Sequence, residues 1–320
     1  MCENSRPTLL ILIPLQPAFV AELERHYRVI EAQEGPNEAL WVRLQGHAVD
    51  AVLSNGSVGL KAEHMDALPG LRLISAFGSG YEGIDVAAAR ARGIQLSHAP
   101  GINNATVADH ALMLMLALAR GIVPLDRAVK SGAWLSSRAE RPTLNGRRLG
   151  LLGMGNIGQQ IAQRALGFDM QVAYCTRQRR ADLPYRHIND LLGLAEQSDY
   201  LVLACPGGDA TRHLVRRPVL RALGPQGFLV NIARGSVLHT GDLIAALQAG
   251  EIAGAGLDVL ETEPEVPPEL RGMPQVLLTP HVSGRSPEAQ RAQLDCLLAN
   301  LDACFAGRQL PNGLTNALAL

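Results

Sequence analysis

The sequence lacks a surplus of charge of either sign. Its 320 residues include 29 lysines and arginines against 30 aspartates and glutamates, so the net charge is −1 with histidines neutral. A protein whose main partner is nucleic acid needs a basic surplus to bind phosphates, and we therefore expect no such partner. Hydrophobic residues still make up 47% of the chain and charged residues 18%, a composition that excludes a disordered protein.

Long hydrophobic runs are also missing. The most apolar run, Ala111–Ala119, has nine residues, whereas a helix needs about 20 to span a bilayer. The first seven residues, MCENSRP, do not have the pattern of a secretory signal. We therefore expect no membrane partner and a cytoplasmic location.

Cysteine is scarce, and the number of cysteines is odd. The five are Cys2, Cys175, Cys205, Cys296 and Cys304. Their spacing matches no zinc-binding pattern, so we expect no metal and interpret them as reduced thiols of a cytosolic protein. Each is interpreted as a small hydrophobic residue of the core.

What the chain does contain is a regular alternation of short apolar runs and helix-like stretches. In the first hundred residues the predicted strands are Thr8–Ile13, Asp50–Ser54, Leu71–Ser75 and Ile94–Ser97. Helix-like stretches at residues 17–26 and 85–92 lie between them. Strands separated by helices predict a parallel sheet that is covered on both faces.

A second series begins after Pro100-Gly101, which interrupts the chain. Residues 105–120 predict one long, largely buried helix, and residues 286–305 predict a final helix. The strands predicted between them are Arg148–Leu152, Gln171–Tyr174, Tyr200–Leu203, Phe228–Asn231, Gly256–Val259 and Val276–Leu278. Residues 263–274, rich in proline, predict an ordered loop. Two such series in 320 residues predict an α/β protein with two doubly wound domains.

Residues 153–158 (GMGNIG) have the G-x-G-x-x-G spacing of a dinucleotide site. They follow the predicted strand that ends at Leu152 and open a helical stretch, which is the required context. In that context Gly153 allows the tight turn, Gly155 lets the backbone approach a pyrophosphate, and Gly158 permits close contact of helix and strand. The start of the helix offers unpaired amides and the positive end of its dipole to phosphates.

The residues expected to contact the adenosine ribose are basic. NAD-binding proteins place an acid about 20 residues beyond the fingerprint, where this chain has Thr176 and Arg177, followed by Arg179 and Arg180. A guanidinium binds a 2′-phosphate with paired hydrogen bonds, whereas an acid would repel it. We therefore predict NADP(H). NAD(H) remains the alternative if these arginines form only a solvated surface cluster.

Polar residues follow three successive predicted strands. Arg234 lies in NIARG, Glu263 in LDVLETEP and His281 in PHVSG. Ligands of doubly wound sheets bind at the carboxyl ends of strands. A histidine can protonate a carbonyl oxygen, a nearby carboxylate favours the charged imidazole, and an arginine binds a substrate carboxylate. Taken singly, Arg234 also fits a loop ion pair, Glu263 a surface charge and His281 a core histidine. Together, beside the fingerprint, they predict hydride transfer to a 2-oxo acid.

A glycine-rich turn, residues 77–80 (FGSG), follows the predicted strand Leu71–Ser75. Its amides can hold a carboxylate, although an ordinary turn between strand and helix has the same composition.

In this order, the motifs resemble those of the D-isomer-specific 2-hydroxyacid dehydrogenases. The matching stretches are residues 77–85 (FGSGYEGID), 104–110 (NATVADH), GMGNIG, NIARG, LDVLETEP and TPHVSG. They extend from about residue 70 to residue 290. Within the family, residues 175–177 (CTR) resemble the NADP-preferring glyoxylate/hydroxypyruvate and hydroxyphenylpyruvate reductases.

The resemblance implies a discontinuous architecture and an activity. Residues 1–101 and 285–320 would form a flavodoxin-like substrate domain, and residues 102–284 an inserted Rossmann cofactor domain. The implied activity is NADPH-dependent reduction of a small 2-oxo acid, such as glyoxylate, hydroxypyruvate or an aryl pyruvate, to the D-2-hydroxy acid. The helix at residues 105–120 must be covered, either by the chain itself or by a second subunit, and the resemblance implies a homodimer that packs this region. Trp134 would then reach a neighbouring subunit's site, or pack in the core or at the dimer interface.

Roles of individual residues follow from the same resemblance. Arg234 would bind substrate, Glu263 would support the acid/base and His281 would be the acid/base. Phe77 and Gly78 would offer backbone amides to the substrate carboxylate. The implied cofactor-binding residues are Thr106, Gly153, Gly155, Asn156, Ile157, Gly158, Thr176, Arg177, Cys205, Pro206, Ile232, Ala233, Arg234, Asp258, His281 and Gly284.

Two departures from the family pattern and two rival functions remain. Leu260 stands where the family often has an aromatic residue, and residues 205–209 are richer in glycine than usual. Formate dehydrogenases have a glutamine in place of the glutamate partner, so Glu263 argues against that activity. The alternative from another functional class is a dinucleotide-sensing corepressor of the same fold. Tight binding of a partner, without turnover of any 2-oxo acid, would favour the corepressor over the enzyme.

Overall fold

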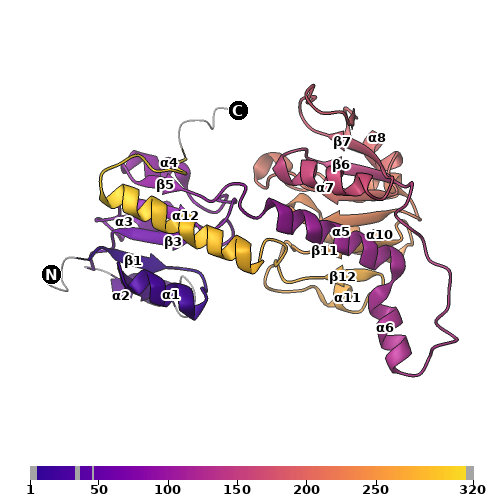
Figure 1. Ribbon diagram of the computed structural model, residues 1–320, viewed down its shortest axis with the longest axis horizontal. Helices are drawn as coiled ribbons and strands as arrows, with labels where there is room; N and C mark the ends of the chain where they lie inside the picture. The colour runs from indigo at the N-terminus through magenta and orange to yellow at the C-terminus, as the bar shows by residue number, and fades with distance from the viewer. Residues whose placement is uncertain (1–5, 33–36, 45–46, 315–320) are drawn as a thin grey trace. The chain divides into compact units, whose positions relative to one another are not determined.

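The computed structural model describes residues 6–32, 37–44 and 47–314. The chain divides into two compact units, Met1–Asn103 with Ser286–Leu320, and Asn104–Arg285. Each unit is built on its own parallel sheet with helices on both faces (Figure 1), which confirms the predicted α/β class. Cys2 lies outside the described residues.

The first unit has five parallel strands in the order β2-β1-β3-β4-β5. This is the flavodoxin-like doubly wound order. The strands are β1 (Thr8–Ile11), β2 (Arg28–Glu31), β3 (Ala51–Ser54), β4 (Leu73–Ala76) and β5 (Gln95–Ser97). Its helices are α1 (Pro17–Glu24), α2 (Glu38–Leu44), α3 (Ala62–Asp66), α4 (Val86–Ala91) and α12 (Pro287–Phe305). Successive residues of a strand pack into opposite cores, so Leu9 and Leu73 contact the side covered by α12, and Leu10 and Ile74 contact the other.

The second unit has seven parallel strands in the order β12-β11-β10-β9-β6-β7-β8. They are β6 (Arg148–Leu152), β7 (Gln171–Cys175), β8 (Arg186–His187), β9 (Tyr200–Leu203), β10 (Phe228–Asn231), β11 (Gly254–Leu257) and β12 (Val276–Leu278). Strand β6 pairs with both β7 and β9. The strand order therefore reverses at β6, and ligands of such sheets bind at this switch point.

Helices cover both faces of this second sheet. One face packs on α5 (Asn104–Arg120) and α7 (Asn156–Leu166) through residues such as Leu151 and Val230. The other face packs on the remaining helices through residues such as Leu152 and Leu229. These helices are α8 (Leu191–Glu196), α9 (Arg217–Leu223), α10 (Thr240–Gln248) and α11 (Pro268–Arg271), with the short helix η3 (Gly235–Val237). The short helix η2 (Asp209–Thr211) has no buried residue.

Two predictions about the second sheet were wrong in detail. Strand β11 ends at Leu257 instead of residue 259, so Asp258 follows the strand. The sequence pattern gave the wrong bounds for this strand because Gly254 and Gly256 are poor strand formers. A Cβ on Gly254 would lie 2.6 Å from the carbonyl oxygen of Gln275, and one on Gly256 3.2 Å from Leu114 of α5. The predicted loop at residues 263–274 contains the short helix α11.

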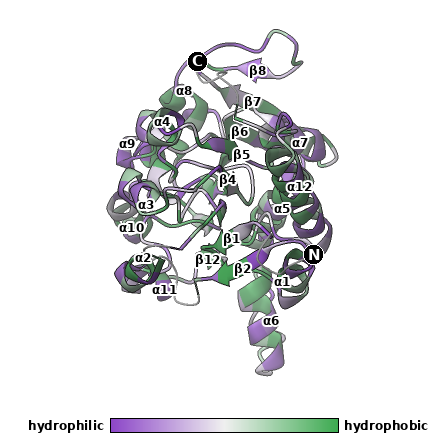
Figure 2. Cartoon of the chain, turned by 90° about the vertical axis from the view of Figure 1, so that its left-hand side faces the viewer, coloured by the Kyte–Doolittle hydropathy of each residue, from purple (hydrophilic) through white to green (hydrophobic). Residues whose placement is uncertain are grey.

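Helix α6 (Ile122–Lys130) differs from the other helices of the second unit. It has no buried residue, although it carries both hydrophobic and hydrophilic residues (Figure 2). By contrast, α5 buries one face against α7 and the sheet of its own chain. Among the described residues, no single helix is long and apolar enough to cross a membrane. Only α5 and α6 taken together meet that length and composition, with a bend of 56° between them.

Candidate active site

The fingerprint glycines form a tight connection between β6 and α7. Gly153 has φ of +102°, and a Cβ there would lie 2.7 Å from the carbonyl oxygen of Ala204. A Cβ on Gly158 would lie 2.5 Å from the carbonyl oxygen of Gly153. These two positions therefore have room for glycine alone, because α7 packs closely against the end of β6.

Gly155 differs from its two neighbours in the fingerprint. It is the N-cap of α7, and a Cβ built on it would meet no atom within 4 Å. The space faces the start of an 11-residue helix whose first residues are Asn156 and Ile157. Unpaired amides at a helix start bind anions. The loop therefore fits the pyrophosphate of a dinucleotide.

Beyond β7 lie the residues predicted to bind the adenosine end of the cofactor. Thr176 is partly exposed, and its carbonyl oxygen lies 3.2 Å from Nε2 of His187. Arg180 forms an ion pair with Asp182 at 2.7 Å, so this arginine is already engaged. Within the described part of the chain, the exposed Arg177 and Arg179 have no such acidic partner. They suit a phosphate better than Arg180 does.

Other predicted cofactor residues also follow strands of the second sheet. Cys205 and Pro206 follow β9, and the hydroxyl of Thr211 closes their loop by donating to the carbonyl oxygen of Pro206 at 2.8 Å. Burial raises the pKa of Cys205 to about 11, so its thiol is neutral and not a nucleophile. The buried Ile232 and Ala233 follow β10. Thr106 lies in the first turn of α5, and Gly284 lies in the segment beyond β12.

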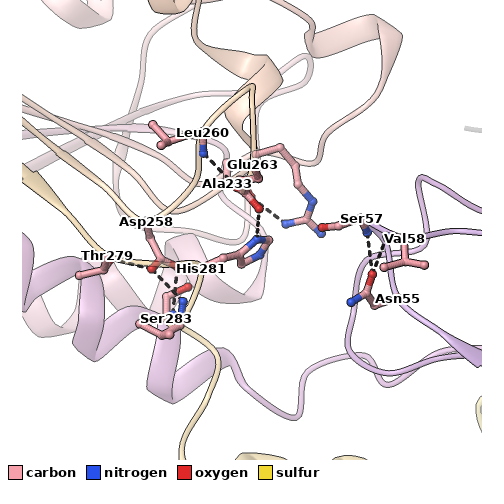
Figure 3. A network of polar contacts seen from close by, with 12 residues as sticks. Asn55, Ser57, Val58, Ala233, Asp258, Leu260, Glu263, Thr279, His281 and Ser283 are labelled. Carbon is pink, nitrogen blue, oxygen red and sulfur yellow. Dashed lines mark hydrogen bonds and ion pairs between the residues drawn. The ribbon is translucent and has the colours of Figure 1, made fainter. Parts of the chain in front are cut away.

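Glu263 and His281 form a direct pair. Nδ1 of His281 lies 2.8 Å from Oε2 of Glu263 (Figure 3). The other oxygen, Oε1, accepts the amide hydrogen of Leu260 at 2.9 Å. Burial raises the pKa of Glu263, but the bond and charge of His281 and the Leu260 amide outweigh it, so the pKa is lowered overall. The carboxylate therefore holds the proton on Nδ1, and Nε2 is the nitrogen that can exchange a proton with a ligand.

A buried carboxylate holds the segment that carries His281. Oδ1 of Asp258 accepts from the hydroxyl of Thr279 at 2.6 Å and from the amide of Val282 at 2.9 Å, and Oδ2 accepts from the amide of Ser283 at 2.9 Å (Figure 3). Burial raises the pKa of Asp258, but these hydrogen bonds lower it overall. His281 itself has φ of +53°, and its amide donates to the carbonyl oxygen of Asp258 at 2.9 Å.

The same network contains two residues that sequence reasoning missed. Nε2 of His110, on α5, lies 3.0 Å from the hydroxyl oxygen of Thr279. Because that hydroxyl gives its one hydrogen to Asp258, its oxygen accepts from Nε2 of His110. His110 lies in the NATVADH motif and Thr279 in TPHVSG. Both motifs can be recognised in the sequence, but no sequence pattern predicts a contact between residues 169 positions apart.

Arg234 is positioned by two glycines. A Cβ on Gly235 would lie 2.0 Å from the backbone of Leu260, so the Arg234 segment and the Glu263 loop are in backbone contact. A Cβ on Gly207 would lie 2.6 Å from Cγ of Arg234. The unusual glycine content of residues 205–209 therefore makes room for the arginine side chain. Its guanidinium donates to the carbonyl oxygen of Ala233 at 2.7 Å.

In the first unit, the structure corrects the prediction for Phe77. Its amide donates to the carbonyl oxygen of Ser54 at 2.8 Å, because the β3–β4 ladder extends one residue beyond β4. That amide is therefore not available to a substrate. Gly78, with φ of +127°, ends the ladder. Within the described residues the amides of Gly78, Ser79 and Gly80 have no hydrogen-bond acceptor.

Comparisons with known proteins agree with this fold. Residues 112–283 match the model of the D-isomer specific 2-hydroxyacid dehydrogenase, NAD binding domain. The chain is 36% identical to a hydroxyphenylpyruvate reductase of Plectranthus scutellarioides, over 94% of this chain and 97% of the relative. It is also 36% identical to a glyoxylate reductase of Pyrococcus furiosus, over 97% of this chain and 96% of the relative.

A solved structure is similar over both units. It is an NADPH-dependent glyoxylate/hydroxypyruvate reductase from Sinorhizobium meliloti in complex with NADP and malonate, with a TM-score of 0.89, 36% identity and 97% coverage of each chain. The fold and the His–Glu pair define a dehydrogenase with a dinucleotide-binding domain. The chain belongs to the D-isomer-specific 2-hydroxyacid dehydrogenase family. The relatives are named as reductases, which does not support the corepressor alternative.

Proposed function

We propose that the protein is an NADPH-dependent reductase that converts a small 2-oxo acid, such as glyoxylate, hydroxypyruvate or an aryl pyruvate, to the D-2-hydroxy acid. The observation that carries this proposal is the His281–Glu263 pair at 2.8 Å, at the carboxyl end of the sheet that also bears the fingerprint loop. The names of the relatives, reductases of glyoxylate and hydroxyphenylpyruvate, support the same substrate class.

The cofactor would be held by residues of the second unit. The fingerprint loop at residues 153–158 would bind the pyrophosphate, and Thr176 with Arg177 would bind the 2′-phosphate of NADP. Cys205 and Pro206 would flank the adenosine. Thr106, Ile232, Ala233 and Gly284 would line the nicotinamide end. When bound, NADPH supplies the hydride. The similar structure that contains NADP supports NADP over NAD as the cofactor.

The chain's own residues would manage the substrate and the proton. Arg234 would bind the carboxylate and polarise the carbonyl with its guanidinium. Nε2 of His281 would give a proton to the carbonyl oxygen as negative charge develops there. Glu263 would keep the imidazole oriented by accepting the hydrogen of Nδ1. The amide of Gly78 would bind the substrate carboxylate, and Asp258 would hold the segment of His281 in addition to lining the nicotinamide pocket.

Domain roles, location and assembly are part of the same proposal. The first unit would be the substrate domain and the second the cofactor domain. Cys175, Cys205, Cys296 and Cys304, the cysteines within the described residues, are unpaired thiols, which supports a reducing, cytoplasmic location. A homodimer is supported by the exposed apolar residues of α6 and of residues 134–135.

The experiment that tests the function is a steady-state assay of 2-oxo acids with NADPH and with NADH. We expect reduction of at least one acid with a clear preference for NADPH. His281→Ala should lower kcat by about 10²–10⁴-fold and leave the Kd of NADPH, measured by fluorescence, unchanged. Retained turnover in this variant would remove His281 from the role, and a preference for NADH would refute the assignment of the 2′-phosphate site.

A further inference from the structure

Gln293, on α12 of the first unit, is a buried polar side chain that the fold does not use. It is 7% exposed, and among the described residues its carboxamide has no hydrogen-bond partner. The other buried amide of α12 is satisfied: Asn300 donates to the carbonyl oxygen of Cys296 at 2.8 Å and accepts from the amide of Asn312 at 3.1 Å. Because the polar atoms of the Gln293 carboxamide keep some contact with solvent, this carboxamide is available to a ligand.

The carboxamide of Gln293 faces the glycine-rich turn after β4. Its Nε2 lies 3.9 Å from the position that a Cβ on Gly78 would occupy. Gly78 begins the run of three amides, at residues 78–80, that have no acceptor in the described residues. The carboxamide of Gln293 therefore lies near a turn whose backbone donors are also unused. Among the described residues no oxygen accepts a hydrogen bond from these donors.

We propose that Gln293 is a specificity-determining residue, which binds a polar substituent of the 2-oxo acid held by the amides of residues 78–80. The inference rests on the proposed reductase function and narrows its substrate class. A carboxamide both donates and accepts hydrogen bonds, so it suits a hydroxyl group, as in hydroxypyruvate. An aryl or alkyl substituent would leave the carboxamide buried without a partner, and a site of that kind discriminates strongly against substrates that lack the hydrogen-bonding group.

The test compares hydroxypyruvate with phenylpyruvate at saturating NADPH. Gln293→Met keeps the length of the side chain and removes its hydrogen-bonding groups. We expect the ratio of kcat/KM for hydroxypyruvate to that for phenylpyruvate to fall by about tenfold or more, mainly through a higher KM for hydroxypyruvate. The KM of NADPH should not change. Gln290→Met is the matched control, because Gln290 lies on the same helix and pairs with Gln16. Its ratio should equal that of the wild type.

The outcomes of this test distinguish a failure of the specificity role from a failure of the proposed function. If the wild type reduces 2-oxo acids and the ratio in Gln293→Met stays within twofold, the specificity role is overturned and the proposed function stands. If the wild type reduces none of them, the proposed function fails and this inference fails with it. Should Gln293→Met not fold, Gln293→Asn withdraws the carboxamide from Gly78 without adding an apolar group, and it should lower the same ratio. An unchanged ratio in Gln293→Asn would then overturn the role.

Discussion

At the scale of single residues, the backbone of His281 needs support from its neighbours. A non-glycine residue with φ of +53° is uncommon and costs free energy. The cost is met by Asp258, whose carbonyl oxygen accepts from the amide of His281 and whose carboxylate accepts from the next two amides. Asp258 is therefore the residue that places the imidazole next to Glu263.

Replacing Asp258 by asparagine should lower both stability and turnover. The asparagine side chain would offer one oxygen where the carboxylate offers two, and hydrogen bonds to a buried charge contribute about 1.5–3 kcal/mol each. We expect Asp258→Asn to lose about 3 kcal/mol in the free energy of unfolding at pH 7, measured by urea denaturation. Turnover should fall because His281 loses its position. Asp66→Asn, which removes an exposed partner of Arg92 in the first unit, is the control and should leave turnover unchanged.

The pH dependence of that difference has a defined sign. The pKa of Asp258 is lowered in the folded protein, so its contribution is fully present above the unfolded value of about 4 and is lost as the pH falls through the folded value. The stability difference between wild type and Asp258→Asn should therefore be constant between pH 6 and 8 and shrink below about pH 4. A difference that grows on acidification would contradict the assignment of the carboxylate as the ionised acceptor.

A second prediction at the residue scale concerns Gly207. A Cβ there would lie 2.6 Å from Cγ of Arg234, so Gly207→Ala should displace the guanidinium while leaving the fingerprint loop intact. We expect the KM for the 2-oxo acid to rise by about tenfold, which corresponds to about 1.4 kcal/mol, and the Kd of NADPH to stay the same. A thermal unfolding curve close to that of the wild type should accompany the change. An unaltered KM would show that Arg234 does not need this space.

At the scale of elements, two glycines of the β6–α7 connection have different roles, one in cofactor binding and the other in folding. Gly155 faces open space, whereas Gly158 contacts Gly153. Gly155→Ala should therefore fold with little loss of stability and weaken NADPH binding by about 10-fold or more, because its methyl group fills the space for the pyrophosphate. Gly158→Ala should destabilise the protein by about 1–3 kcal/mol. Titration fluorescence and urea unfolding measure the two effects. The reverse pattern would contradict the proposed position of the pyrophosphate.

The strands that could be predicted to the residue are mostly buried. Strands β6, β9, β10 and β12 begin and end at the predicted residues, because each is a short apolar run between polar residues. Strand β2 was not predicted, since its charged, exposed ends remove that contrast. Helix α6 was not predicted either, because Gly121 before it and Pro124 in its first turn are typical of a turn.

The site was predictable to the same degree, and for a related reason. Arg234, Glu263 and His281 lie in the loops after β10, β11 and β12, so their position at the carboxyl end of the sheet follows from the order of the elements. Whether the Phe77 amide is free to bind a ligand depends on which carbonyl of β3 faces it. His110 contacts Thr279 only because α5 packs on the sheet. Register and helix packing are set by tertiary contacts, which a local pattern does not contain.

At the scale of the whole molecule, the dimer expected from the sequence would cover α5, and this stays a prediction. Helix α5 buries one face against its own chain and leaves Met113 exposed. Exposed apolar residues also occur on α6 and the residues after it, which we name the α6 surface: Ile122, Val123, Val129, Trp134 and Leu135. Trp134 is 64% exposed and Leu135 77%, so the interpretation of Trp134 as a core residue of its own chain was wrong.

A surface of this kind should be covered by a second copy of the chain. Contiguous exposed apolar residues mark protein interfaces, and identical chains associate most often as two-fold dimers. We expect the wild type to sediment at micromolar concentration with twice the mass of the 34.2 kDa chain. Leu135→Asp combined with Trp134→Asp should give a folded monomer, because a charge cannot be buried there without a partner. Leu192→Asp, at an exposed leucine of α8, is the matched control and should remain dimeric. A monomeric wild type would refute the dimer, and a dimeric double variant would move the interface away from the α6 surface.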